Sequence, residues 1–392
     1  MNSFTSTGIL IALLLAAGVS PGLGQSVGAS SKLRDTALAL EREGNAAGAE
    51  AAWKTILETS PKNAEACARI AFLESQQQPY TEAVRYYRKA AAIDPSTPSL
   101  RMNLGLALFK AGKLKDAAAV FVPLYHQAPP DSPEAQRLRL LIGLADYGSD
   151  AYAASVPFLQ DAMARDPQDL PYRLVLAHAC LWSKQYQCVL DVYRQILNLN
   201  AESAEADMLA GEAYDEMRDH EDAIQQFRNA AKVDPKVPGV HFGLGYLLWG
   251  QNSFEEAAQQ FQLEADNTLG DGQAIAYWAD SEVRLGHAET ARPLLERALK
   301  IDAKQELSWL DLGIIDADAG HNDDALREFR TAARLNPSDV QVHWRLARLY
   351  RSMGMKAEAE GEFARAKSLN KAANEKLVEK LHPQQVEAGG PR

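Results

Sequence analysis

The sequence is short of the residues that build metal centres and nucleic-acid surfaces. Its 392 residues include three cysteines and eight histidines, and the histidines show no paired spacing of the kind that holds a metal. Lysine and arginine never form a run, and the formal net charge is −11. Because phosphate binding needs a clustered cationic face, nucleic acid is excluded as a partner class, and no metal site is predicted.

The common catalytic motifs are also missing. The chain has no HExxH, no P-loop and no GxSxG. Gly243-Leu244-Gly245 lacks the third glycine of a dinucleotide-binding loop and follows no predicted strand. The abundant aspartates and glutamates are interpreted as solvated helix faces. We therefore predict that the protein is not an enzyme and that it needs no cofactor.

The first 24 residues have the pattern of an export signal. Gly8 to Val19 is an apolar run too short to span a bilayer comfortably, and Gly22-Leu23-Gly24 offers a small-x-small cleavage site. No Lys or Arg precedes the run, so an uncleaved membrane anchor stays open as the alternative. A lipid anchor is not expected, because no cysteine lies near the end of the run.

This signal predicts export to the periplasm or cell envelope, or a cytoplasmic protein if the segment is not a functional signal. Membrane contact is expected only through an uncleaved signal. The absence of any Asn-x-Ser/Thr acceptor mildly supports a bacterial origin. Residues 25–29 are predicted to be a short linker.

A repeat of 34 residues accounts for almost all of the remaining chain. It is clearest in Ala204 to Val237, where apolar residues at helical spacing form two stretches that end at Asp234-Pro235. The same frame fits ten units over residues 30–373, with one four-residue insertion at 132–135. Two helices bury too little apolar surface to be stable alone, so the copies must stack.

Three positions of the repeat support this frame. The eighth residue of every unit is Ala or Gly, and the twentieth is Ala in eight units, with Ser155 and Val189 as the exceptions. The twenty-fourth is always large and is apolar or aromatic. Proline at position 32 ends the second helix in six units. The side chains at position 24 are Trp53, Tyr87, Phe121, Leu159, Tyr193, Phe227, Phe261, Leu295, Phe329 and Phe363.

This pattern of small, small, aromatic and proline residues resembles the tetratricopeptide repeat family. The resemblance implies an all-α fold, a right-handed superhelix of stacked antiparallel helix pairs. It also implies that the first helix of each pair lines a concave channel. Residues 374–392 are expected to form a capping helix followed by a disordered tail.

By that resemblance, function should lie on the concave face. Positions 5, 9, 12 and 13 of each first helix reach the channel in such arrays, and here they are unusually apolar. The predicted partner-binding residues are Phe109, Tyr147, His178, Trp182, Glu212, Asp215, Glu216, Phe242, Tyr246, Trp249, Trp344 and Arg348.

Two interpretations of this lining stay open. The aromatic residues could be packing between neighbouring units, or they could form an exposed groove for partner proteins or peptides. We expect a non-enzymatic interaction scaffold of the bacterial cell envelope, in which Glu212, Asp215 and Glu216 form an acidic cluster. The alternative is a receptor for a small apolar or sugar-like ligand in the aromatic channel.

Cys180 and Cys188 could form a disulfide. They fall on either side of the turn between the two helices of one unit, and an oxidising compartment would favour a bridge. A spacing of eight residues does not establish the geometry, so the bridge is an open possibility at this stage.

Overall fold

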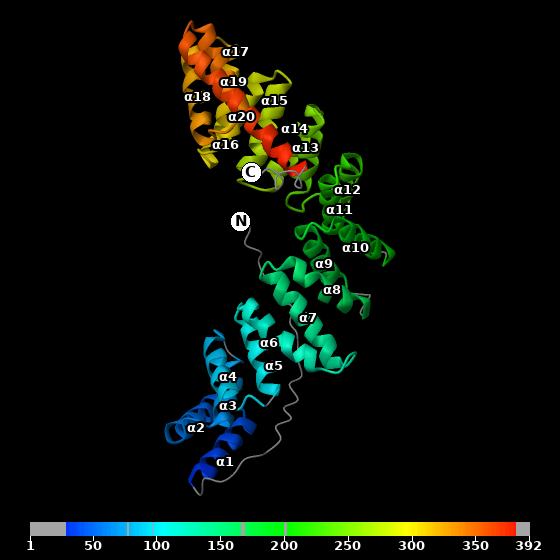
Figure 1. The fold of residues 1–392 in the computed structure, drawn as a ribbon, viewed down its shortest axis with the longest axis vertical. Helices are drawn as coiled ribbons and strands as arrows, with labels where there is room; N and C mark the ends of the chain where they lie inside the picture. Colours follow the sequence, from blue (N-terminus) through cyan, green and yellow to red (C-terminus); the bar gives the residue numbers. More distant parts are fainter. Residues whose placement is uncertain (1–28, 77, 97, 166–168, 200–201, 382–392) are drawn as a thin grey trace, which may run out of the picture. The chain divides into compact units, whose positions relative to one another are not determined.

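The computed structural model describes residues 29–76, 78–96, 98–165, 169–199 and 202–381, and within these ranges the chain forms twenty α-helices and no β-strand (Figure 1). The predicted signal peptide and the predicted disordered tail lie outside the described residues. The chain divides into two compact units between Ser149 and Asp150. No helix in the described part is long and apolar enough to cross a membrane.

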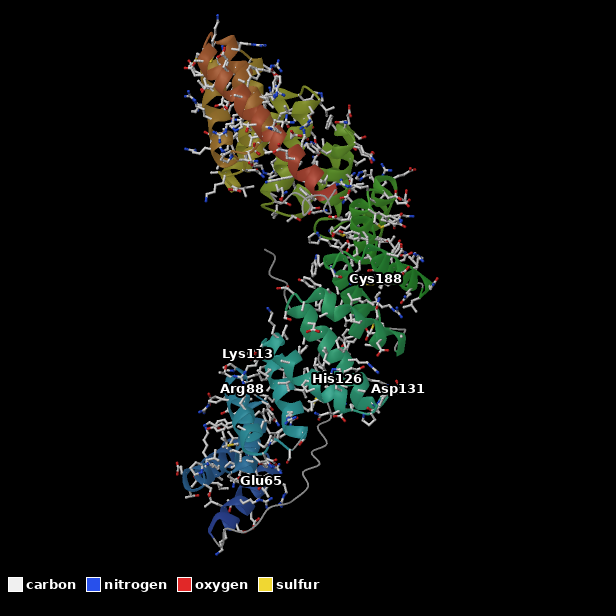
Figure 2. The ribbon with its side chains drawn as sticks, in the orientation of Figure 1. Glu65, Arg88, Lys113, His126, Asp131 and Cys188 are labelled. Carbon is white, nitrogen blue, oxygen red and sulfur yellow. A yellow bond between two sulfur atoms is a disulfide. The ribbon has the colours of Figure 1, made fainter. Side chains whose placement is uncertain are left out.

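The first unit contains seven helices, each packed against the next along the chain. Ion pairs also link its repeats: Arg34 contacts Glu65 at 2.7 Å, and Arg88 contacts Asp116 at 2.8 Å (Glu65 and Arg88 are labelled in Figure 2). The helices are α1 (Ala29–Arg42), α2 (Ala46–Thr59), α3 (Ala64–Glu74), α4 (Thr81–Ile93), α5 (Pro98–Lys110), α6 (Leu114–Gln127) and α7 (Pro133–Gly148).

The second unit contains thirteen helices arranged in the same way. Contacts also join several successive first helices, such as α9 with α11 and α15 with α17. The helices are α8 (Tyr152–Arg165), α9 (Leu170–Trp182), α10 (Tyr186–Asn198), α11 (Ala204–Glu216), α12 (His220–Val233), α13 (Val240–Gly250), α14 (Phe254–Asn267), α15 (Gly272–Arg284), α16 (Ala288–Ile301), α17 (Glu306–Asp318), α18 (Asn322–Leu335), α19 (Val340–Ser352) and α20 (Lys356–Leu381).

The predicted all-α solenoid of stacked antiparallel helix pairs is confirmed. One helix pair falls in each of the ten stretches that the repeat defines. The division between the compact units falls inside the fourth stretch, so that α7 belongs to the first unit and α8 to the second.

The insertion at 132–135 lies mostly within a helix and not in a turn. Helix α7 begins at Pro133, so three of the four inserted residues add to the helix. Ser132 caps it, because its hydroxyl accepts a hydrogen bond from the Ala135 amide at 3.1 Å. Proline at the first helical position costs no hydrogen bond, which favours this early start.

The capping helix expected near the end of the chain is not a separate element. Helix α20 runs without a break from Lys356 to Leu381 and so continues the second helix of the tenth pair. Lys371 occupies the position at which other units have proline, and no Gly or Pro follows Gly361 within the helix. Nothing in this stretch therefore stops the helix where the earlier ones stop.

Other second helices end in a recurring side-chain turn. At position 31, a carboxylate or amide oxygen accepts a hydrogen bond from the backbone amide two residues later. Asp234 does so from Lys236 at 2.9 Å, and Asp302 from Lys304 at the same distance. Asp94 and Asn336 make equivalent bonds. This turn fixes the exit of the chain towards the next first helix.

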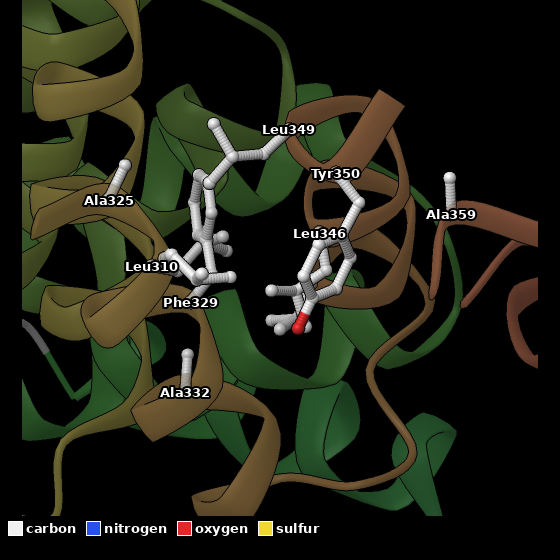
Figure 3. Close-up of a cluster of buried hydrophobic side chains, with 10 residues drawn as sticks. Leu310, Ala325, Phe329, Ala332, Leu346, Leu349, Tyr350 and Ala359 are labelled. Carbon is white, nitrogen blue, oxygen red and sulfur yellow. The ribbon is translucent and has the colours of Figure 1, made fainter. Parts of the chain in front are cut away.

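The core is built from the small and large positions of the repeat. The residue at position 20 is buried in every helix pair, and the residue at position 24 is fully or partly buried in every pair. Figure 3 shows one such cluster, in which Phe329 and Ala325 of α18 pack with Leu310 of α17 and with Leu346 of α19. Burial of these side chains between successive pairs is what holds the stack together.

Glycine at position 8 makes room for the aromatic ring at position 24. A methyl group at Gly313 would lie 2.5 Å from Cδ1 of Phe329, and one at Gly245 would lie 2.9 Å from Cε1 of Phe261. Gly243 makes room for a ring of the preceding helix pair, since a methyl group there would lie 2.4 Å from Cε1 of Phe227. The two glycines of Gly243-Leu244-Gly245 are thus explained by packing.

We expect Gly313→Ala to lower the free energy of unfolding by about 1–2 kcal/mol. The added methyl overpacks a buried ring, which costs about 1–3 kcal/mol, and this outweighs the gain in helix propensity. Gly361→Ala is the matched control, because Gly361 is exposed in α20 with open space around it. Chemical denaturation should show that variant to be slightly more stable than the parent. Equal effects at the two sites would contradict the packing explanation.

A buried pair of carboxyl groups makes the second unit sensitive to pH. Glu328 is 5% exposed, and burial together with the neighbouring Asp316 raises its pKa to about 7. Burial alone would also raise the pKa of Asp316. Hydrogen bonds from Arg292 and His321 have the larger effect, so the pKa of Asp316 is lowered. The folded protein therefore holds a proton on Glu328 that an unfolded chain would release near its usual pKa of about 4.3.

We expect Glu328→Gln to flatten the dependence of stability on pH. The contribution of the Glu328 proton is fully present below about pH 4.3 and is lost as the pH rises through about 7. Between pH 5 and pH 8, the free energy of unfolding of the variant should rise by on the order of 1 kcal/mol relative to that of the parent. Chemical denaturation of both proteins at pH 5 and at pH 8 measures this difference. The same substitution at the exposed Glu296 is the control. A gain that does not change with pH would contradict this account.

Candidate partner-binding groove

An open groove of about 590 Å³ follows the first helices of three successive pairs, α9, α11 and α13. It lies wholly within the second unit. Its lining is mainly aromatic and acidic, and Lys184 is the single basic residue in it. The lining residues are Leu181, Trp182, Lys184, Tyr186, Met208, Glu212, Asp215, Glu216, Phe227, Pro238, Gly239, Phe242, Gly243, Tyr246 and Leu247.

Three carboxylates of α11 line the middle of the groove. Glu212, Asp215 and Glu216 are spaced at three and four residues, so they lie on one face of the helix. Asp215 bonds to Nδ1 of His220 at 3.0 Å, and Glu216 accepts a hydrogen bond from the Tyr186 hydroxyl at 3.1 Å. These partners hold two of the three carboxylates in place.

Glu212 is the carboxylate without such a partner. It makes no hydrogen bond within the described part of the chain, although it is open to water. The atoms crowded around it raise its pKa; His178 opposes this shift, and the negative charges of Asp215 and Glu216 add to it. A ligand cation at this point would offset the repulsion among the three acids.

Aromatic rings lie on both sides of these acids. Trp182 of α9 is 44% exposed, and its ring lies 4.7 Å from Tyr152 and 5.1 Å from His178. Tyr246 of α13 is 46% exposed and stacks on Phe242 at 6.3 Å. Exposed aromatic rings that are held by neighbouring rings are typical anchors of protein interfaces.

Six of the twelve predicted residues come together in this groove: Trp182, Glu212, Asp215, Glu216, Phe242 and Tyr246. His178 lies beside it, half-buried, and bonds to Glu205 at 2.8 Å. The groove also contains residues that the prediction missed, including Lys184 and Tyr186. Lys184 belongs to the turn between α9 and α10, and Tyr186 is the first residue of α10, whereas the prediction considered only first helices.

The other five predicted residues lie elsewhere. Phe109 and Tyr147 are half-buried side chains of the first unit. Trp344 and Arg348 lie in a second cavity of the second unit. Trp249 is half-buried beside the groove and does not line it.

The surroundings of Trp249 favour the packing interpretation. Its indole N–H donates to the carboxylate of Asp280 in α15, and Arg284 lies 4.8 Å from its ring. Asp280 is 2% exposed and also accepts a hydrogen bond from Arg284 at 2.7 Å. The ring thus joins two successive helix pairs.

We expect Trp249→Ala to destabilise the fold by about 1–2 kcal/mol and to leave groove binding unchanged within about twofold. The substitution removes buried ring area and one donor to the buried Asp280 carboxylate. Thermal unfolding and ligand titration of the same preparation separate the two effects. Normal stability combined with weak binding would instead make Trp249 a partner anchor.

The structure contains a disulfide between Cys180 and Cys188. Their Cα atoms lie 5.8 Å apart, and the bridge joins α9 to α10 across the turn that carries Lys184 (Cys188 is labelled in Figure 2). The short antiparallel turn between the two helices brings the two cysteines within bridging range. The third cysteine, Cys67, is free and buried.

Within the described residues, no group of His, Cys, Asp and Glu side chains could hold a metal ion. The fold and the groove define a helical-repeat protein with an open aromatic and acidic groove. A family model described as tetratricopeptide repeat matches residues 34–98, 208–271 and 310–374, and a second model with the same description matches 74–142. The chain belongs to the tetratricopeptide repeat family.

Several curated proteins are similar in sequence. The chain is 22% identical to "Protein CTR9 homolog" of Arabidopsis thaliana over 74% of its length and 28% of that protein. It is 26% identical to "BBSome complex member BBS4" of Bos taurus, over 54% of its length and 40% of that protein. The chain thus spans well under two thirds of these relatives.

Solved structures show similar helix pairs. The chain "Crystal structure of APC/C hetero-tetramer Cut9-Hcn1" aligns over 88% of both chains at 11% identity, with a TM-score of 0.43. "Crystal structure of YrrB: a TPR protein with an unusual peptide-binding site" aligns over 45% of this chain and 91% of that one, at 18% identity and a TM-score of 0.38.

Proposed function

We propose that this protein is a non-enzymatic interaction scaffold that binds an extended, basic segment of a partner protein in the groove of α9, α11 and α13. The observation that carries the proposal is the combination of three carboxylates with exposed aromatic rings in one open groove. A Lys or Arg side chain satisfies both features, because the carboxylates attract its charge and the rings cover its methylene stem.

The shape and lining of the groove indicate what kind of partner segment it would bind. It crosses three helix pairs and is open along its length, which suits an extended segment better than a compact ligand. Apolar residues between the basic ones would contact Trp182, Phe242 and Tyr246. The name of the relative BBS4, a complex member, is consistent with a role in assembly.

Designed peptides test this proposal directly. Three ten-residue probes that alternate leucine with lysine, glutamine or glutamate can be titrated by fluorescence anisotropy at low and high salt. We expect the lysine peptide to bind at least tenfold more tightly than the glutamine peptide, to weaken with salt, and the glutamate peptide not to bind. Equal affinity for all three would refute the basic-segment proposal.

We further propose that the protein acts in the bacterial cell envelope. The apolar run at 8–19 and the small-x-small site at 22–24 favour export, and the disulfide of Cys180 and Cys188 suits an oxidising compartment. Fractionation of cells that express the full chain should place it in the periplasm or membrane fraction, with the bridge oxidised. A reduced, cytoplasmic protein would overturn this part.

A small-molecule receptor is the second candidate. The exposed faces of Trp182 and Tyr246 beside a carboxylate could stack on an apolar or sugar-like ligand. A ligand screen read by tryptophan fluorescence tests it, with Trp182→Phe as the control. A response that survives this substitution would place the ligand elsewhere.

A further inference from the structure

A second cavity, of about 420 Å³, lies along the first helices of the last three pairs, α15, α17 and α19. Its size falls in the range of about 300–1,000 Å³ that is usual for small-molecule sites. Unlike the groove, it combines acids, arginines and an apolar wall. The lining residues are Asp280, Val283, Arg284, Leu310, Asp311, Ile314, Asp318, Gln341, Trp344, Arg345 and Arg348.

One wall carries a buried carboxyl group with an unused oxygen. Asp311 is 1% exposed, and its Oδ2 has no hydrogen-bond partner. Burial, followed by the nearby charge of Asp280, raises its pKa well above the usual range, while Arg284 and Arg345 oppose the shift. A buried carboxyl oxygen without a hydrogen bond is destabilising, and a ligand could supply the missing donor.

Helix α19 contributes two arginines whose guanidinium groups have no direct bonding partner among the described residues. Within the described chain, Arg345 and Arg348 make no hydrogen bond and no ion pair. Arg284 on α15 differs, because it is already bonded to Asp280. The protein has a net charge of −11, so arginines without a carboxylate partner are unexpected in it. Two such guanidinium groups in one cavity indicate a binding site for an anionic group.

The remaining wall is apolar. Trp344 is 49% exposed, and its ring is held edge-on against Phe363 at 5.2 Å. Leu310 and Ile314 of α17 line the same cavity. A flat or branched apolar side chain would therefore find a matching surface between the donor and acceptor groups.

We propose that this cavity binds a free α-amino acid with an apolar or aromatic side chain. The ligand's ammonium group donates to Oδ2 of Asp311, its carboxylate pairs with Arg345 and Arg348, and its side chain packs on Trp344 and Ile314. This site is separate from the groove, and the inference does not rest on the proposed scaffold function.

A zwitterion fits better than a simple ion. A cation alone would satisfy Asp311 but would face two unpaired guanidinium groups. An anion alone would pair with the arginines and leave Oδ2 of Asp311 buried without a donor. The α-amino acid carries both groups at the separation of one carbon atom, and it brings the apolar side chain as well.

Calorimetric titration of the full-length protein tests the proposal with L-phenylalanine, L-leucine, N-acetyl-L-phenylalanine and L-phenylalaninamide. We expect the two free amino acids to bind, and each blocked derivative to bind at least tenfold more weakly. N-acetylation removes the charged donor to Asp311, and amidation removes the charge that pairs with the arginines. Absence of binding by both free amino acids, or equal binding of free and blocked forms, would overturn the proposal.

Substitutions locate the site. Asp311→Asn and Arg345→Gln should each weaken L-phenylalanine binding at least tenfold, whereas Arg351→Gln, on the same helix but outside the cavity, should leave it unchanged. Should Asp311→Asn fail to fold, the comparison of free with N-acetylated ligand probes the same contact in the unaltered protein. Unchanged affinity in a folded Arg345→Gln variant would contradict the assignment.

Discussion

Replacing Phe261 with alanine is expected to lower the free energy of unfolding by about 3–5 kcal/mol. The ring is fully buried at position 24 of its repeat, next to Gly245, and rings of Phe242 and Tyr277 lie 5.5 and 5.4 Å away. Removal of a buried aromatic ring loses its transfer free energy and leaves a cavity, and losses of this size are usual. Denaturant unfolding measures the change.

The matched control lies on the same helix. Leu263 is 44% exposed in α14, so Leu263→Ala should change stability by less than about 0.5 kcal/mol. Because a repeat array is stabilised by its neighbours, amide hydrogen exchange in the Phe261→Ala variant should rise first in α13, α14 and α15. Similar effects of the two substitutions would mean that position 24 does not anchor the stack.

Neutralising two acids of the groove is expected to weaken binding of the lysine–leucine peptide by about 10- to 100-fold. Glu212→Gln with Glu216→Gln keeps the side-chain shape but removes two of the three negative charges that face the ligand. A charge pair at a partly desolvated interface contributes about 1.5 kcal/mol or more, which gives the expected range. Anisotropy titration at low salt provides the measurement.

A control double variant outside the groove changes the net charge of the protein by the same amount as the groove variant. Glu255 and Glu289 are exposed residues of α14 and α16 that lie outside the groove. Their joint substitution by glutamine should alter affinity by less than twofold, since screened charges at a distance contribute little. If the control weakened binding as much as the groove variant, the attraction would come from the overall charge of the protein.

Much of the fold could be predicted from the sequence because its determinants repeat. Small residues at positions 8 and 20 and a large one at position 24 recur every 34 residues, and each meets the same neighbours in each pair. The exceptions have local causes. Helix α7 begins at Pro133, inside the insertion. Helix α20 continues past Lys371, which occupies the position where proline ends the second helix of other units.

The site was only half predictable, because its determinants do not repeat. The frame placed Glu212 and Tyr246 on the helix face that lines the candidate groove, but it could not show that Trp249 donates to Asp280, which lies 31 residues further along the chain. Lys184 reaches the groove from a turn and Tyr186 from the start of a second helix, and the frame considered neither place. The spacing of Cys180 and Cys188 allowed a bridge, but only the packing of α9 on α10 brings the sulfur atoms together.

The central claim is that the groove of α9, α11 and α13 holds a basic segment of a partner. Photo-crosslinking in the living cell tests it most directly, with a benzophenone amino acid in place of Tyr246 and, as the control, in place of Leu263. The account predicts a specific adduct at position 246 only, whose crosslinked peptide, identified by mass spectrometry, carries Lys or Arg between apolar residues. An adduct of equal yield at position 263, or a crosslinked segment that is acidic, would contradict it.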